Sequence, residues 1–156
     1  GNFAEAEAVV LLRAMRQTMG RDGLALIGID LHKDTALIEA AYNDAQGVTA
    51  AFTLNLLARL NREIGSDFDL DESRPRARYP AARLRIETDL VSQWPQDVHL
   101  GGRTFHFAAG EPIRVEYSHK YTDDSLDALL QQAGLQVAQR WDAESPAYGL
   151  RLLRVA

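Results

Sequence analysis

Leu24-Ala25-Leu26-Ile27-Gly28-Ile29-Asp30 is the part of the sequence on which the fold depends most. A continuous apolar run of this kind is typical of a strand buried on both faces, as in a parallel sheet beneath helices. A helix is predicted before it, because one helical face collects Ala8, Leu11, Leu12, Met15 and Met19. Gly20 is expected to end that helix. A helix followed by a buried strand is the rhythm of an α/β fold.

The residues after this strand favour a loop and two helices. Leu31–Asp34 is polar and follows the carboxyl end of the strand, where ligands bind in open α/β sheets. A short helix is predicted over 35–43, and Gly47 separates it from a longer one that ends near Ile64. The charged segment Asp67–Pro80 holds two prolines and is predicted to be a loop.

From residue 83 the apolar pattern becomes strand-like. We expect an antiparallel sheet of three or four strands over 83–121, with a turn at Gly101-Gly102. The helical pattern returns after Thr122, which can cap a helix that Gly134 ends. Two strands, 135–141 and 148–155, follow, joined by a polar connection containing Pro146. A β-rich section is therefore predicted inside an α/β framework.

The composition narrows the possible functions. The chain has 156 residues, is 46% hydrophobic and carries a net charge of −5, which argues against nucleic acid as a partner. It has no cysteine, so disulfides, thiolate zinc sites and cysteine nucleophiles are excluded. No apolar run approaches the roughly 20 residues that span a bilayer. The four histidines lack metal-ligand spacing. We expect a cytoplasmic protein without a metal.

The chain opens at Gly1-Asn2-Phe3, without methionine or a signal segment, and enters a helix almost at once. This beginning indicates a piece of a longer protein. Processing, or a residue left by expression, would also explain a leading glycine.

An ordered set of segments resembles the ergothioneine-pathway histidine N-alpha-methyltransferase family. The set covers nearly the whole chain, and its segments are Leu26–Asp34, Ala41–Phe52, Asn55–Glu63, Asp67–Leu70, Arg85–Glu87, Phe107–Glu111 and Glu116–Tyr121. The opening Gly1-Asn2 fits the end of a Gly-Ser-Thr-Ile-Gly-Asn segment of this family.

The resemblance implies a fold, a cofactor and an activity. The fold would be part of a class I (Rossmann-like) methyltransferase sheet, residues 1–32 and 121–156, with an inserted α+β substrate-binding domain, residues 33–120. The activity would be transfer of methyl groups from S-adenosyl-L-methionine (SAM) to the α-amine of L-histidine. The family's SAM loop lies upstream, and no G-x-G-x-G follows a strand here. We therefore expect no cofactor-binding residues in this chain, and no activity from it alone.

The resemblance also implies five substrate-binding residues. Asn2 would contact the backbone end of histidine, Tyr42 its carboxylate, and Glu116 and Ser118 its imidazole. Thr88 stands where the family's archetype has a methionine, which leaves the exact amine substrate open. A physical argument also supports Glu116 and Ser118 as a pair, because residues two apart on a strand share a face. A carboxylate and a hydroxyl can then meet both ring nitrogens. The sequence assigns no catalytic base.

The candidate residues also have ordinary structural interpretations, and the chain has other possible functions. Glu116 and Ser118 would ordinarily be a solvent-facing pair, Tyr42 a packing residue and Asn2 a helix cap. The chain could instead be a non-catalytic module that binds an amino acid or imidazole, or part of a methyltransferase for another amine. An open strand edge predicts self-association of the chain through Leu24–Asp30 or a neighbouring strand.

Overall fold

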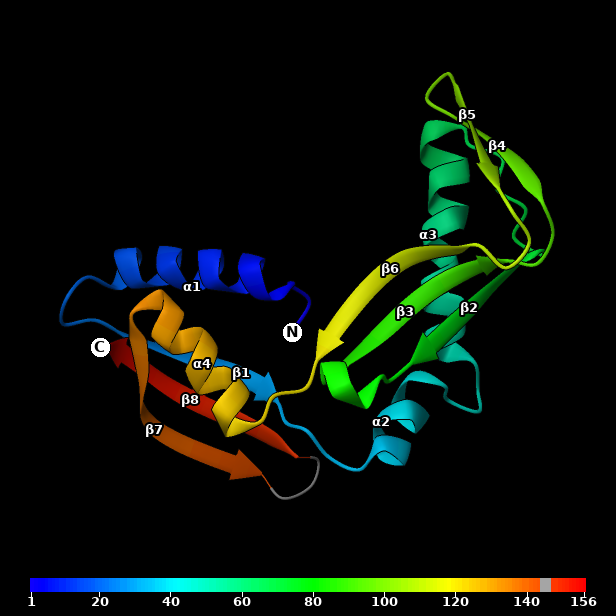
Figure 1. Cartoon of the computed structure of the whole chain (residues 1–156). Coiled ribbons are helices and arrows are strands. Elements are labelled where there is room, and N and C mark those ends of the chain that lie inside the picture. Colours follow the sequence, from blue (N-terminus) through cyan, green and yellow to red (C-terminus); the bar gives the residue numbers. More distant parts are fainter. Residues whose placement is uncertain (144–146) are drawn as a thin grey trace. The chain divides into compact units, whose positions relative to one another are not determined.

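The computed structural model describes residues 1–143 and 147–156 (Figure 1). The connection at Pro146 lies outside them. The chain divides into two compact units. Unit 1 consists of Gly1–Asp34, Ala81–Arg85 and Tyr117–Ala156, and unit 2 of Thr35–Pro80 and Ile86–Glu116. The division expected from the sequence, with residues 33–120 as the insertion, differs from these units at residues 33–34, 81–85 and 117–120.

Unit 1 is a three-stranded sheet with two helices on one face (Figure 1). Its sheet has the order β1-β8-β7, and both pairings are antiparallel. Val9 and Leu12 of the first helix meet Leu129 and Leu130 of the second over Leu153 of the sheet. The elements of unit 1 are α1 (Glu5–Met19), β1 (Leu24–Asp30), α4 (Asp123–Ala133), β7 (Leu135–Ala143) and β8 (Tyr148–Val155).

The predicted ends of these helices are confirmed. Gly20 follows the last residue of α1 with a φ of 69°, and Gly134 follows α4 with a φ of 71°. Both angles favour glycine, because other residues meet a steric penalty there. Thr122 caps α4: its hydroxyl oxygen accepts a hydrogen bond from the backbone N–H of Ser125 at 3.1 Å.

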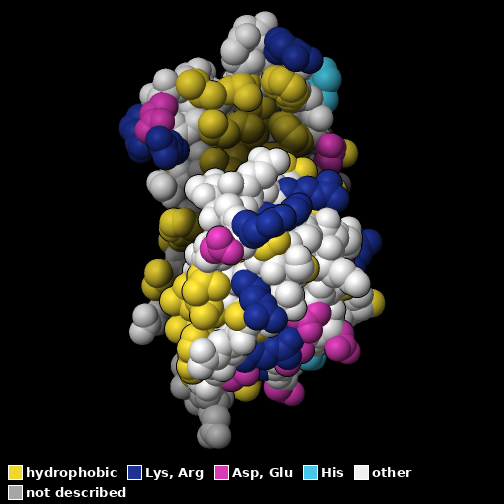
Figure 2. All heavy atoms as spheres, turned by 90° about the vertical axis from the view of Figure 1, so that its left-hand side faces the viewer, with side chains coloured by type: hydrophobic (Ala, Val, Ile, Leu, Met, Phe, Trp, Pro, Cys, Tyr) yellow, Lys and Arg dark blue, Asp and Glu magenta, His cyan; other side chains and the backbone are white. Residues whose placement is uncertain are grey.

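The prediction that β1 is buried on both faces is wrong for the described chain. Leu24 and Leu26 are 58% and 59% exposed, whereas Ile29 is buried. The reason is that α1 and α4 pack on one face of the sheet and nothing in the described chain covers these two leucines. β1 also lies at the edge of its sheet and pairs with β8 alone. Hydrophobic side chains lie among charged ones on the surface that Figure 2 draws.

Unit 2 combines two helices with two small sheets, which have the orders β2-β3-β6 and β4-β5. The turn at Gly101-Gly102 joins β4 to β5, as predicted. A one-turn helix at Ala81–Arg83, which belongs to unit 1, precedes β3. The elements are α2 (Thr35–Tyr42), α3 (Val48–Ile64), β2 (Ser73–Arg78), β3 (Arg85–Ser92), β4 (Gln96–Leu100), β5 (Arg103–Phe107) and β6 (Pro112–His119).

The loop predicted over 67–80 is wrong in part, because Ser73–Arg78 forms β2 and pairs antiparallel with β3. Pro75 is tolerated since β2 is an edge strand, and a proline there costs no hydrogen bond inside the sheet. No helix among residues 1–143 and 147–156 is long and apolar enough to cross a bilayer.

Candidate functional site

Asn2 and Ser118 come together at the end of β6 in unit 1. The Asn2 side-chain amide donates a hydrogen bond to the carbonyl oxygen of Tyr117 at 2.9 Å. The backbone N–H of His119 donates to the carbonyl oxygen of Gly1 at 2.9 Å. The first two residues therefore run beside the strand that carries Ser118. The Asn2 side chain contacts β6 instead of capping α1.

A hydrogen-bonded chain of charged groups extends from Ser118. The ammonium of Lys120 donates to the Ser118 hydroxyl oxygen at 2.7 Å and forms an ion pair with Asp30 at 2.9 Å. Lys33 contacts the other carboxylate oxygen of Asp30 at 2.7 Å. The Lys120 side chain is only 2% exposed. An ammonium this deeply buried needs such partners, because losing its hydration costs several kcal/mol, about as much as its ion pair returns.

The two lysines keep Asp30 ionised. Burial raises the pKa of the Asp30 carboxyl, but hydrogen bonds and positive charge from Lys33 and Lys120 outweigh it and hold the pKa below its ordinary value. The Asp30 carboxylate therefore stays ionised through the neutral pH range.

Backbone hydrogen bonds fix the position of Lys120. Its N–H donates to the carbonyl oxygen of Leu84 at 2.7 Å. The backbone N–H of the next residue, Tyr121, donates to the backbone carbonyl oxygen of Asp30 at 2.8 Å, and the Tyr121 carbonyl oxygen accepts from the N–H of His32 at 2.9 Å. Leu84 has a positive φ of 46°, which is strained for a residue with a side chain. The end of β1 and the end of β6 are thus tied together within unit 1.

Tyr42 and Thr88 meet in unit 2, where both line a cavity of about 50 Å³ between the helices and β2-β3. Thr88 is 3% exposed, and its hydroxyl has no hydrogen-bond partner among the described residues. The two predicted residues thus line one small cavity of unit 2.

The turn after α2 holds Tyr42 in place. The side-chain amide of Asn43 donates to the carbonyl oxygen of Ala77 in β2 at 3.4 Å. Asp44 caps α3 by accepting from the N–H of Thr49 at 2.9 Å. The backbone and side-chain hydrogen bonds from Thr49 lower the pKa of the Asp44 carboxyl. These hydrogen bonds account for Asn43 and Asp44 without a ligand.

Glu116 lies on the opposite face of the β2-β3-β6 sheet from Thr88. The helix face is defined by the residues that pack with Leu57 of α3, namely Leu90, Ile113 and Val115. Thr88 lies two residues before Leu90 on β3, so both side chains point to this face. Glu116 directly follows Val115 on β6, so its side chain points to the other face. The predicted residues of unit 2 are therefore divided between the two faces.

The face that carries Glu116 also carries a buried charge cluster that the sequence analysis did not identify. Glu87 and Asp89 are almost fully buried on β3. Arg114 contacts Asp89 at 2.5 Å and Glu87 at 3.2 Å. Arg76 and Arg78 of β2 lie opposite them in register, with contacts of 3.1 Å to Asp89 and 3.6 Å to Glu87. In the sequence, arginines alternate along β2 and acidic residues alternate along β3, and this pattern could have indicated the cluster.

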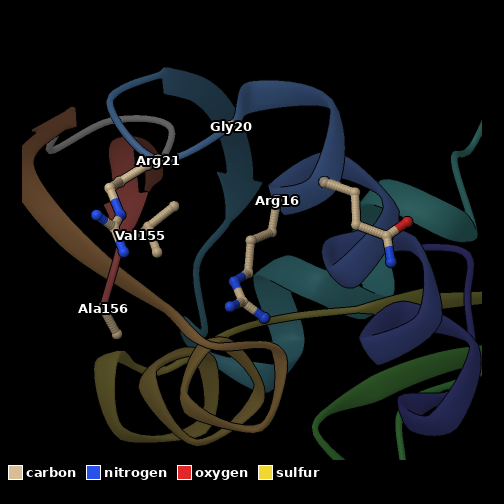
Figure 3. Close-up of a pocket in the computed structure, with 6 residues that line it drawn as sticks. Arg16, Gly20, Arg21, Val155 and Ala156 are labelled. Atoms are coloured by element: carbon tan, nitrogen blue, oxygen red, sulfur yellow. The ribbon is translucent and has the colours of Figure 1, made fainter.

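A wider hollow lies elsewhere in unit 1. It measures about 680 Å³ and opens beside the end of α1, where Arg16 and Arg21 approach Val155 and Ala156 (Figure 3). It holds none of the five predicted residues. Two basic side chains on an open surface do not define a ligand, so we assign nothing to it.

Comparison with known families identifies the chain. The sequence model of the "histidine-specific methyltransferase, SAM-dependent" family matches residues 1–155. The chain belongs to this family.

Individual relatives are about twice as long. The histidine N-alpha-methyltransferase of Mycolicibacterium smegmatis is 37% identical over 97% of this chain, and that of Mycobacterium tuberculosis is 38% identical over 97%. Each alignment covers 48% of the relative, so this chain spans about half its length. The L-tryptophan methyltransferase trpM of Psilocybe serbica is 29% identical over 99% of this chain and 44% of its own length.

Proposed function

We propose that the complete gene product is an enzyme that transfers methyl groups from SAM to the α-amine of L-histidine, in ergothioneine biosynthesis. The family match and the two mycobacterial relatives support this substrate. One structural observation carries the proposal for this chain. Glu116 and Ser118 lie two residues apart on β6, and Asn2 is hydrogen-bonded to the residue between them.

The proposed pair recognises the imidazole ring. The Glu116 carboxylate accepts from the ring N–H, and the Ser118 hydroxyl meets the other nitrogen. A site built to hydrogen-bond both nitrogens rejects leucine, because its polar groups would be left without partners.

The remaining candidates serve the amino-acid end of the substrate. We propose that the Asn2 amide, which both donates and accepts, contacts the backbone end of histidine, and that the Tyr42 hydroxyl binds the carboxylate. Thr88 supports Tyr42 from the helix face of the sheet. Methyl transfer needs a neutral amine aimed at the methyl group, so positioning and exclusion of water are the main contributions of these residues.

No residue of this chain is assigned to SAM. In its 156 residues no G-x-G-x-G loop follows a strand, and we propose that the SAM-binding residues lie outside this chain. We propose that unit 1 is part of the class I methyltransferase domain and that unit 2 is the substrate-binding insertion. We further propose a cytoplasmic protein with no nucleic-acid or membrane partner.

The proposed activity predicts different results for the complete gene product and for this chain alone. With isotopically labelled SAM, the complete protein is expected to label the α-amine of L-histidine and to leave L-leucine unlabelled. The 156-residue chain is expected to transfer nothing. Mass spectrometry of the amino acid after reaction reads out both. Transfer by the chain alone would contradict the missing SAM site. Histidine binding without transfer by the complete protein would favour a non-catalytic imidazole-binding module.

A second candidate substrate is another amine. Thr88 departs from the methionine expected by resemblance, and a relative named as an L-tryptophan methyltransferase matches nearly the whole chain. L-Tryptophan therefore belongs among the amino acids tested. Labelling of tryptophan and not histidine would support this alternative.

The edge strand predicts self-association of the isolated chain. β1 offers backbone groups on its outer edge and two exposed leucines beside them. We expect the 156-residue chain to elute as a dimer or larger species in size-exclusion chromatography with light scattering. Leu26→Lys is expected to shift it toward monomer, since charge on an edge opposes pairing. A monomeric wild-type chain at high concentration would disprove the prediction.

A further inference from the structure

Unit 1 holds a cavity that the proposed function does not use. It measures about 390 Å³ and lies among the start of α1, the segment before β3, the end of β6 and α4. None of the five residues proposed for the substrate is among the described residues that line it. Sites for small molecules measure roughly 300–1,000 Å³. The cavity is therefore large enough for a small organic ligand.

His119 lines this cavity and has a polar atom that the fold does not satisfy. The residue is 9% exposed, and its Nε2 atom is buried without a hydrogen-bond partner among the described residues. The ring is held between two others: Tyr117 lies edge-on at 6.4 Å between centroids, and Tyr121 stacks on it at 6.2 Å. Buried polar groups in native proteins almost always have a hydrogen-bond partner. A ligand that hydrogen-bonds this ring supplies one.

The charges around the ring favour a negative ligand. Burial lowers the pKa of His119, and the positive charge of Arg85 lowers it by more than the negative charge of Glu5 raises it. The imidazole is therefore neutral at pH 7 and offers a single N–H donor. Arg83 lines the cavity as well. Both arginines act on a ligand through their charge, in addition to the contacts that they make within the protein.

We propose that this cavity binds a small organic anion, whose carboxylate or phosphate oxygen accepts a hydrogen bond from the neutral His119 ring. Leu84 and Leu129 also line the cavity and contact the carbon skeleton of the ligand. Glu5 is exposed in the first turn of α1 at the same cavity, and its negative charge opposes the anion. The inference does not rest on the proposed substrate.

Nuclear magnetic resonance of the complete gene product, isotopically labelled in histidine, tests the proposal. The probes are inorganic phosphate and acetate at about pH 7.5, with sodium chloride keeping the ionic strength constant. We expect at least one probe to shift the His119 signal along a saturating curve, and the tighter probe identifies the class of anion. The signal absent from His119→Phe, or from His119→Gln if the former does not fold, is that of His119. The exposed His99 and His106, paired with Asp67 and Asp97, are internal controls whose signals are expected not to saturate.

Two variants in the first turn of α1 test where the anion binds. Glu5→Gln removes the opposing charge and is expected to tighten binding of the probe about two- to fivefold, the effect of one exposed charge pair. Glu7→Gln is the matched control. Glu7 is not among the described residues that line the cavity, and its carboxylate accepts from the backbone N–H of Ala4 at 2.9 Å. A glutamine oxygen also accepts there, so the wild-type affinity is expected.

The outcomes separate a built site from a general effect of ions. Saturation at His119 together with tighter binding by Glu5→Gln supports the site, because misfolding does not increase affinity. A His119 signal that moves linearly with both probes, or as much with chloride alone, overturns the inference. Equal affinities of Glu5→Gln and Glu7→Gln overturn it as well. Loss of histidine methylation leaves this test unaffected, so the proposed function and this inference fail separately.

Discussion

Glu116→Gln is expected to lower kcat/KM of the complete gene product for L-histidine by about 100-fold, since a hydrogen bond to a charged group contributes roughly 1.5–3 kcal/mol. Glutamine keeps the shape of the side chain. It lacks the negative charge, and its amide can present a donor to a ring N–H. The loss is expected in the affinity for histidine and in the preference over leucine alike.

Glu111→Gln is the matched control for this variant. Glu111 is exposed at the turn before β6, where its carboxylate accepts from the backbone N–H of Ala108 at 2.8 Å. A glutamine retains an acceptor there, so wild-type kcat/KM is expected. Steady-state kinetics with both amino acids measures these effects. If Glu116→Gln kept full histidine preference, Glu116 would be the ordinary surface residue that strand statistics favour.

Local signals in the sequence predicted the helices well. Gly20, Thr122 and Gly134 act through their own backbone and their nearest neighbours, so their roles are visible without the rest of the fold. The exposure of Leu24 and Leu26 was not predictable in the same way. Burial depends on which other elements pack on a strand, and the apolar residues of the strand itself do not show which elements those are.

Strand β2 escaped detection because its sequence, SRPRAR, is charged and contains a proline. Its stability in the sheet comes from partners on β3 that are far along the chain. The alternation of arginines with Glu87 and Asp89 becomes meaningful only once the register is known. This cluster is a tertiary property that one strand alone does not encode.

The candidate site shows the same division between local and tertiary information. Strand alternation predicts that Glu116 and Ser118 share a face. Lys120, which donates to the Ser118 hydroxyl, follows the end of β6, and the sequence analysis overlooked it. Alternation cannot relate two strands to each other. The placement of Thr88 and Glu116 on opposite faces required the packing of β3 and β6 against α3.

Asp89→Ala is expected to destabilise the protein by about 3–5 kcal/mol, because breaking a buried ion pair leaves charges without compensation. Asp89 is 0% exposed and holds Arg114 at 2.5 Å and Arg76 at 3.1 Å. Removing its carboxylate leaves Glu87 as the remaining buried anion of the cluster for Arg76, Arg78 and Arg114. Chemical denaturation of the complete gene product, followed by a signal from unit 2, measures the change.

Two further variants serve as controls: one removes an exposed acid elsewhere, and the other removes only the charge of Asp89. Asp71→Ala removes an exposed aspartate just before β2 and is expected to change stability by less than about 0.5 kcal/mol. Asp89→Asn keeps the shape and an acceptor but not the charge, so it is expected to be nearly as harmful as Asp89→Ala. If Asp89→Asn were neutral, hydrogen bonding rather than charge would hold the arginines. If Asp89→Ala itself were neutral, the sheet face beside Glu116 would not depend on the cluster, because water would replace the missing carboxylate.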